Sequence, residues 1–218
     1  MDEQRSMTDR IRWVACLTVL VAAVTAGCSA PEPGLARGEV VWNTCVPCHG
    51  SVGQGNASLA APAIAGLPDW YVTAQLEKFK EGWRGSHPMD TVGIRMKSMA
   101  RAFDREGDRE SVAAYVAQLP ATHPPVTLEG GNAARGQEEY ARGCVACHGA
   151  QGEGVQVVGS PTLLVQDDWY LLAQFNKFKS GWRGAHPQDG SGQMMVEASA
   201  AFDEQDMIDI LAYLRTLH

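Results

Sequence analysis

Apolar residues near the carboxyl end of the chain recur at the spacing of an α-helix. Asp203 precedes this stretch as a candidate N-cap, and Asp206 would lie in the first turn, where a carboxylate favours the helix dipole. Other segments show helical spacing and none shows sustained strand alternation, so the sequence predicts an all-α fold. The apolar face of the last helix consists of Met207, Ile208, Ile210, Leu211, Leu214 and Leu217, and an earlier helix has the matching face Val112, Tyr115, Val116 and Leu119.

Two segments pair a glycine with an aromatic residue four positions later, namely Gly38 with Trp42 and Gly136 with Tyr140. Residues at this spacing lie on one face of a helix. A glycine there allows another helix to approach closely, while the aromatic ring packs beside the crossing. We therefore expect a close helix crossing at each of these two glycines.

The chain repeats itself at an offset of 99 residues. In the 20-residue blocks that begin at Trp70 and Trp169, 13 positions are identical, which indicates a duplication. A period this long makes each copy a domain rather than a solenoid unit. We predict domain one at residues 35–121, a short linker with proline and glycine at 122–130, and domain two at 131–218.

The N-terminal residues have the pattern of a targeting segment. Arg10 and Arg12 precede an apolar run at residues 13–26, which is short for a membrane span. The run closes with Val-Thr-Ala-Gly before Cys28, a sequence that resembles a lipobox. We expect residues 1–27 to be a signal peptide and Cys28 to be lipidated, which would anchor the exported protein to the periplasmic side of a bacterial membrane. An ordinary cleaved signal peptide and an uncleaved anchor are the alternatives.

The composition is that of a soluble globular protein, with 45% hydrophobic and 20% charged residues. The formal net charge is −7, and it stays at −7 when residues 1–27 are removed. A chain without a basic tract lacks the electrostatic footprint of a nucleic-acid-binding protein. Any charged docking partner should instead present a positive patch.

Four of the six cysteines form two Cys-x-x-Cys-His motifs, and the other two are Cys16 and Cys28 in the N-terminal segment. This spacing is the signature of c-type haem attachment. Two thiols one helical turn apart add to the haem vinyl groups, and the adjacent histidine becomes the proximal ligand of the iron. The sequence predicts two covalent haem c groups, one on Cys45, Cys48 and His49 and the other on Cys144, Cys147 and His148.

A redox dithiol and half of a zinc site are the competing interpretations of a Cys-x-x-Cys pair. A redox dithiol is expected near a strand–helix–strand unit, and the second cysteine pair of a zinc ribbon lies much closer than 99 residues. Neither interpretation explains why a histidine follows both pairs.

Several features together resemble class I cytochrome c. They are the motif near the start of each domain, the glycine and aromatic residue of the first helix, and a late methionine before a closing helix with Tyr115 or Tyr213. The tandem arrangement is similar to the dihaem cytochrome c4 family, from about residue 35 to the end. The Gly-Trp-Arg-Gly-x-His-Pro stretch is more typical of related oxidase-associated cytochrome domains. The resemblance implies two tandem class I cytochrome c domains.

The resemblance also implies a hydrogen-bond acceptor for each proximal histidine. The carbonyls of Pro62 and Pro161 would accept the ring N–H of His49 and His148, which orients the imidazole and raises its basicity. A rigid turn is the alternative role for these two prolines.

The second axial ligand should fall on equivalent positions of the two domains. Met96 and Met195 are the only methionines that are in register, and they lie where this family has its ligand, just before the closing helix. A core-filling role is the alternative for any methionine. The rival ligands are His87 and His186, which are also in register, and His/His ligation would lower the potential relative to His/Met.

The remaining candidates are two Trp-Arg pairs, Trp83 with Arg84 and Trp182 with Arg183. An indole N–H and a guanidinium are suitable donors for haem propionates, so these residues would cover and pair with them. Surface packing of the aromatic residues is the alternative.

Two protein ligands on each iron leave no open position for a small-molecule substrate, so we expect an electron carrier and not an enzyme. A dihaem peroxidase needs a vacant or releasable position, and a dihaem thiosulfate dehydrogenase of the known kind uses a cysteine ligand that this chain cannot spare. The expected partners are redox proteins, such as a respiratory complex, an oxidase or a reductase. The alternative function is a dihaem subunit of a larger respiratory complex.

Overall fold

The computed structural model describes residues 30–103 and 105–217. The predicted signal peptide, Cys16 and the proposed lipidation site Cys28 lie outside these residues. Within the described part of the chain, none of the helices is long and apolar enough to cross a membrane.

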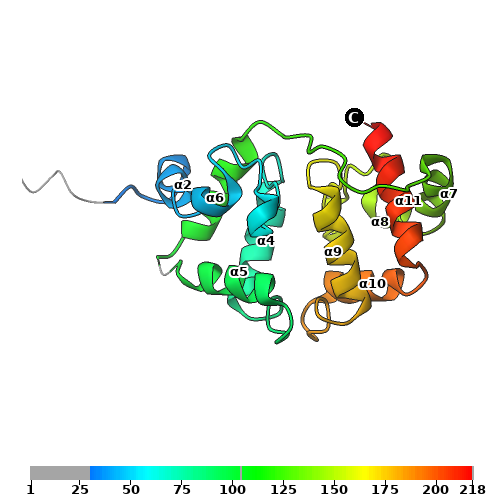
Figure 1. Cartoon of the computed structure of the whole chain (residues 1–218). Coiled ribbons are helices and arrows are strands. Elements are labelled where there is room, and N and C mark those ends of the chain that lie inside the picture. Colours follow the sequence, from blue (N-terminus) through cyan, green and yellow to red (C-terminus); the bar gives the residue numbers. More distant parts are fainter. Residues whose placement is uncertain (1–29, 104, 218) are drawn as a thin grey trace, which may run out of the picture. The chain divides into compact units, whose positions relative to one another are not determined.

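The described residues form helices and loops without a strand, which confirms the predicted all-α fold (Figure 1). Their only β-type pairings are two isolated bridges, Asn56 with Ala61 and Val155 with Ser160. Domain one contains α2 (Leu35–Trp42), α3 (Val46–His49), the 3₁₀ turn η2 (Ala57–Leu59), α4 (Asp69–Lys80), α5 (Thr91–Arg101) and α6 (Asp108–Gln118). Domain two repeats this order with α7 (Ala133–Gly143), α8 (Val145–His148), η3 (Gln156–Val158), α9 (Asp168–Lys179), α10 (Gly190–Ser199), α11 (Glu204–Leu214) and η4 (Arg215–Leu217).

The last long helix begins where its capping residues predict. The Asp203 carboxylate accepts a hydrogen bond from the Asp206 backbone N–H, and the Asp206 carboxylate accepts one from the Asp203 N–H, which forms a capping box. The predicted apolar face is turned inward, because Leu211 and Leu214 are each 1% exposed. Burial of one such leucine contributes about 1.5–3 kcal/mol to stability.

Both predicted glycine crossings are present. α2 packs on α6 and α7 packs on α11. A Cβ atom added to Gly38 would overlap the backbone carbonyl oxygen of Ser111, and one added to Gly136 would overlap that of Asp209. Each domain therefore brings its first and last long helices together at a residue without a side chain.

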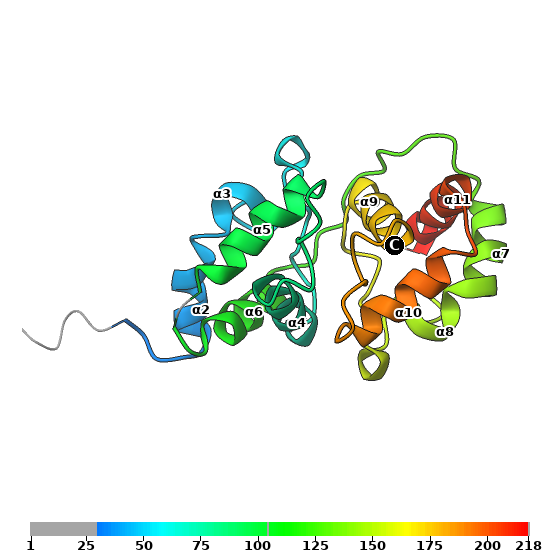
Figure 2. The ribbon, with the colours of Figure 1, turned by 90° about the horizontal axis from the view of Figure 1, so that it is seen from below.

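The cores of the two domains lie on either side of a shared contact. Domain one packs around Trp42, Phe79 and Val116, and domain two packs around Tyr140 and Ile210. A smaller cluster of Leu67, Tyr71 and Val165 joins residues of both domains. In two views at right angles, α4 and α9 lie on the facing sides of the domains (Figures 1 and 2).

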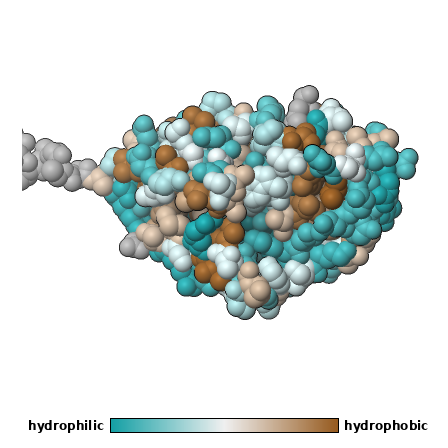
Figure 3. Space-filling view, viewed as in Figure 1, coloured by the Kyte–Doolittle hydropathy of each residue, from teal (hydrophilic) through white to brown (hydrophobic). Residues whose placement is uncertain are grey.

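The face seen in Figure 1 carries small groups of hydrophobic residues among hydrophilic ones (Figure 3). The hydrophobic groups are scattered over both domains and do not merge into one continuous patch on this face. A distribution of this kind is ordinary for a surface in contact with water.

Candidate functional site

The short helices α3 and α8 place each pair of cysteines one turn apart. The amide N–H of His49 donates to the Cys45 carbonyl at 2.9 Å, and that of His148 donates to the Cys144 carbonyl at 2.8 Å. This single helical turn presents two thiols and the following imidazole to the same space. All four cysteines are free thiols of intermediate exposure.

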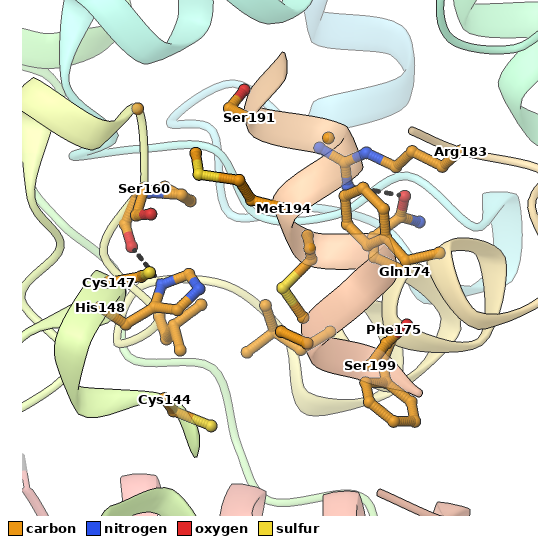
Figure 4. A pocket seen from close by; sticks show the side chains of 18 of the residues that line it. Cys144, Cys147, His148, Ser160, Gln174, Phe175, Arg183, Ser191, Met194 and Ser199 are labelled. Carbon is orange, nitrogen blue, oxygen red and sulfur yellow. Dashed lines mark hydrogen bonds between the residues drawn. The ribbon is translucent and has the colours of Figure 1, made fainter. Parts of the chain in front are cut away.

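Each motif histidine has a hydrogen-bonding partner that fixes its tautomer. Nδ1 of His49 lies 2.8 Å from the carbonyl oxygen of Pro62, and Nδ1 of His148 lies 3.1 Å from that of Pro161 (Figure 4). Because a carbonyl can only accept, Nδ1 must carry the proton, which leaves the lone pair of Nε2 free for a metal. The hydrogen bonds expected from the resemblance are therefore present.

Burial keeps these imidazoles neutral. It lowers the pKa of His49, with a further lowering by the charge of Arg95 and an opposing effect of the hydrogen bond to Pro62. Burial also lowers the pKa of His148, again opposed by its hydrogen bond to the proline carbonyl. A neutral imidazole is the form that binds a metal.

Each motif opens onto a cavity with mainly apolar walls. The cavity of domain one has a volume of about 290 Å³ and is lined by Cys45, Cys48, His49 and Met96. The cavity of domain two has a volume of about 130 Å³, and its lining includes the equivalent Cys144, Cys147, His148 and Met195. The apolar walls include Leu76, Phe79, Val112 and Val116 in domain one and Leu171, Phe175, Phe202 and Ile210 in domain two.

The methionines are not equivalent in exposure. Met96 and Met195 are partly buried and pack against the cores of their domains. Met99 and Met194 also line the cavities, but these residues are 39% and 46% exposed. Figure 4 shows Met194 on α10, across the domain-two cavity from Cys147 and His148.

The matched histidines outside the motifs line neither cavity. His87 stacks on Trp182 with ring centroids 4.6 Å apart, and His186 stacks on Trp83 at 5.3 Å. Both stacks join one domain to the other. The two tryptophans therefore lie at the domain contact and are not among the residues lining the cavities. This placement does not support their sequence-based assignment to the haem propionates.

The two arginines of the Trp-Arg pairs do line the cavities. Arg84 is 7% exposed and Arg183 is 8% exposed. Their hydrogen bonds go to neutral groups: Arg84 donates to Gln75, Tyr170 and Gln174 at 2.7–2.9 Å, and Arg183 donates to Gln174 and Gln75 at 3.0 Å and to Tyr71 at 3.5 Å.

A buried guanidinium among neutral acceptors is unfavourable unless an anion is also near. The Asp90 carboxylate is one such anion for Arg84, and the propionates of a haem in each cavity would supply further ones. The thiols, the Nε2 lone pair and the thioether supply the rest of the donor set. The residues present therefore fit the cofactor that the motifs predict.

Sequence reasoning missed that each cavity is completed by the other domain. Tyr71, Gln75 and Lys78 of domain one line the domain-two cavity, and Tyr170, Gln174 and Lys177 of domain two line the domain-one cavity. These residues are identical at the 99-residue offset, which was a visible signal. Identity alone does not reveal whether a side chain serves its own domain or the other one.

Comparison with known proteins gives matches to cytochromes and to a protein named as an electron acceptor. The cytochrome c family profile matches residues 35–120 and again residues 133–218. The thiosulfate dehydrogenase electron acceptor of Thiomonas intermedia is 31% identical over 187 residues, which are 82% of this chain and 79% of that protein. Cytochrome c4 of Azotobacter vinelandii is 27% identical over 212 residues, covering 94% of this chain and 99% of that protein.

Two further matches are a solved structure and a subunit of an oxidase complex. The crystal structure of reduced cytochrome c4 from Pseudomonas stutzeri superposes with a TM-score of 0.67 at 26% identity, over 86% of this chain and all of that one. A FixP subunit of the cbb3-type cytochrome c oxidase of Bradyrhizobium diazoefficiens is 32% identical over 139 residues. That match covers 59% of this chain and 44% of the FixP subunit.

Proposed function

Because the chain belongs to the cytochrome c family, as a dihaem cytochrome c4-like electron carrier, we propose that it transfers electrons between respiratory proteins in the periplasm. Two covalently bound haem c groups supply reversible one-electron chemistry. The observation that supports the carrier role most strongly is the lining of each cavity, which brings together two cysteines, a histidine with a free Nε2 and a methionine.

We assign the roles as follows. Cys45 with Cys48, and Cys144 with Cys147, form the thioether links. His49 and His148 are the proximal ligands, held in place by the carbonyls of Pro62 and Pro161. Met96 and Met195 are the distal ligands, because they line the cavities whereas His87 and His186 do not.

The surrounding residues favour electron transfer over catalysis. Apolar walls exclude water and limit the reorganisation that accompanies a change of charge. Arg84 and Arg183 hold their charge among neutral acceptors and would pair with the propionates. A methionine thioether is a neutral, soft donor that favours the ferrous state and raises the potential.

A test of the carrier role uses carbon monoxide, which binds ferrous haem only where a ligand position is open. The mature protein should keep its haem stain after denaturation, and its mass should exceed that of the polypeptide by two haems. The reduced protein should not bind carbon monoxide at either iron. A single haem, or carbon monoxide binding at equilibrium, would contradict the proposal and favour an enzyme.

The membrane anchor is a separate part of the proposal, supported by the sequence before Cys28. Replacing Cys28 with Ala should release the protein from membranes into the soluble periplasmic fraction. The anchor would be disproved by a wild-type protein that is already soluble.

A second candidate function is a subunit of a larger respiratory complex, which the partial similarity to a cbb3-type oxidase subunit favours. The relatives named as electron acceptors of thiosulfate dehydrogenase instead favour a carrier that receives electrons from such an enzyme. Gentle extraction of membranes distinguishes the two. A carrier elutes alone from size-exclusion chromatography, whereas a subunit elutes with partners in fixed stoichiometry.

A further inference from the structure

Two ion pairs at the domain contact join a lysine of one domain to an aspartate of the other. Nζ of Lys78 lies 2.6 Å from Oδ1 of Asp189, and Nζ of Lys177 lies 2.6 Å from Oδ1 of Asp90. The aspartates are 2% and 4% exposed, and the lysine side chains are 15% and 16% exposed. Both lysines and both aspartates are 99 residues apart, so the two ion pairs are equivalent.

Each aspartate also caps the helix that carries a proposed distal ligand. Asp90 is the N-cap of α5 and accepts a hydrogen bond from the Gly93 N–H at 2.8 Å. Asp189 does the same for α10, with the Gly192 N–H at 3.0 Å. α5 carries Met96 and α10 carries Met195.

The glycines keep each carboxylate in this position. A Cβ atom added to Gly93 would overlap the Asp90 carboxylate, and one added to Gly192 would overlap that of Asp189. The carboxylates therefore lie tightly against the first turns of the ligand helices.

Each ion pair lines the cavity of the aspartate's own domain. Asp90 and Lys177 line the domain-one cavity, and Lys78 and Asp189 line the domain-two cavity. Burial lowers the pKa of the Lys78 ammonium, while Asp189 opposes this effect and Arg183 and Arg84 add to it. A lysine of one domain thus supplies a positive charge at the haem cavity of the other.

The charges of these Lys–Asp pairs affect the haem potentials because water screens buried charges poorly. An unpaired carboxylate beside a haem stabilises the ferric state and lowers the reduction potential. A lysine that neutralises the carboxylate removes this effect, and a lysine without its carboxylate has the opposite one.

On this basis, and assuming the haem ligation of the proposed function, we propose that Lys78 sets the reduction potential of the domain-two haem and Lys177 that of the domain-one haem. Each haem then reaches its wild-type reduction potential only when the other domain is docked against it. The two lysines are positioning residues that act through Asp189 and Asp90, and neither is an iron ligand.

The test measures both midpoint potentials of the complete dihaem protein by spectroelectrochemical titration. Met96→His and Met195→His, each of which shifts one potential, assign the two values to the domains. Lys78→Met should lower the domain-two potential by about 59 mV, equivalent to a tenfold fall in the equilibrium constant for its reduction. The domain-one potential should stay nearly unchanged.

A charge cycle separates an electrostatic effect from a loosened contact. Asp189→Asn should raise the domain-two potential, and the double variant Lys78→Met/Asp189→Asn should return it toward the wild-type value. Lys78→Arg, which keeps the positive charge, should retain the wild-type domain-two potential. The matched control is Lys80→Met, which removes the same charge from the same helix at a residue that lines neither cavity.

Equal shifts at both haems in Lys78→Met, a shift no larger than that of Lys80→Met, or no rescue in the double variant would overturn the inference. If Lys78→Met does not fold, the same comparison is made with Asp189→Asn and with Lys177→Met at the domain-one haem. Loss of covalent haem or of methionine ligation in the wild-type protein would refute the proposed function itself. Unshifted potentials with intact ligation would refute this inference alone.

Discussion

Domain one and domain two have the same proposed ligand set, but different charges surround it. Arg95 of α5 and Met194 of α10 occupy equivalent positions and both line their cavities. The charge of Arg95 reaches the proximal ligand, since it contributes to the lowered pKa of His49. Residues 35–121 include nine lysines and arginines and nine acidic residues, whereas residues 131–218 include six lysines and arginines and eleven acidic residues.

Duplication can therefore leave the chemistry of a site unchanged while its electrostatics diverge. A positive charge near a haem stabilises the ferrous state, and negative charges destabilise it. We therefore expect the domain-one haem to have the higher potential. Electrons would then pass from domain two to domain one.

The largest effect should follow from removing a distal ligand. Met96→His should lower the domain-one potential by about 100 mV or more, a part of the ~0.8 V range that axial ligands span. This change would reverse the expected order of the two haems. The oxidised protein should also lose about half of its weak sulfur-to-iron charge-transfer band, because one of two equivalent ligands is gone.

The matched control for the ligand prediction is the pair of histidine variants. His87→Ala and His186→Ala should keep the full charge-transfer band. A lost low-spin spectrum in these variants, with the methionine variants unaffected, would move the ligand assignment to His87 and His186.

Exchanging the residues at the divergent position should reduce the difference between the domains. Arg95→Met should lower the domain-one potential, and Met194→Arg should raise the domain-two potential. Each substitution should change the equilibrium constant for reduction of that haem by only about threefold, because water screens the charge of an exposed guanidinium. Redox titration of each variant and of the double exchange measures the effect, and an unchanged gap between the two potentials would show that position 95 does not set it.

Acid should destabilise domain two more than domain one. In domain one, the hydrogen bond from Arg37 lowers the pKa of Asp108 more than burial raises it. In domain two, burial raises the pKa values of Asp168 and Asp209. Hydrogen bonds led by Thr127 for Asp168 and by Asn132 for Asp209 outweigh this effect, so both pKa values are lowered.

A carboxyl group with a lowered folded-state pKa contributes stability that is complete above its unfolded pKa of about 3.9 and is lost as the pH falls through the folded value. Two such buried carboxylates in domain two against one in domain one predict that domain two opens first below about pH 4. Hydrogen exchange of each domain during acid titration measures this order. Opening of domain one first, or of both together, would contradict it.

The two domains also differ in the hydrogen bond made by the aromatic residue beside each glycine crossing. The Tyr140 hydroxyl donates to the carbonyl of Gly149 at 2.7 Å, whereas the Trp42 indole N–H donates to that of Ser51 at a longer 3.3 Å. Tyr140→Phe should lower the stability of domain two by about 0.5–1.5 kcal/mol, the net value of one hydrogen bond. Chemical denaturation of the holoprotein measures it, and Tyr115→Phe in domain one is a control with the same change of atoms.

The amino-acid sequence was sufficient to predict the features that depend mainly on neighbouring residues. Gly38 indicated a close helix crossing, although its partner Ser111 on α6 was found only in the folded structure. The capping box at Asp203 and the turn that aligns Cys45 with Cys48 each depend on a few consecutive positions. Helical propensity and local hydrogen bonds are sufficient to specify them. The 99-residue repeat also indicated that the glycine crossing and the motif turn would occur twice. The capping box does not recur, because Gly107 stands at the position equivalent to Asp206 and α6 has no side-chain cap.

Which domain each interface side chain serves became evident from the folded structure and not from the sequence. Trp83 and Lys78 are matched in the repeat like the motif residues, yet one stacks on His186 and the other lines the opposite cavity. The repeat gives each residue an equivalent but does not specify how two equivalent surfaces dock. That arrangement depends on contacts between residues about 100 positions apart, such as Lys78 with Asp189, and no local pattern in the sequence encodes them.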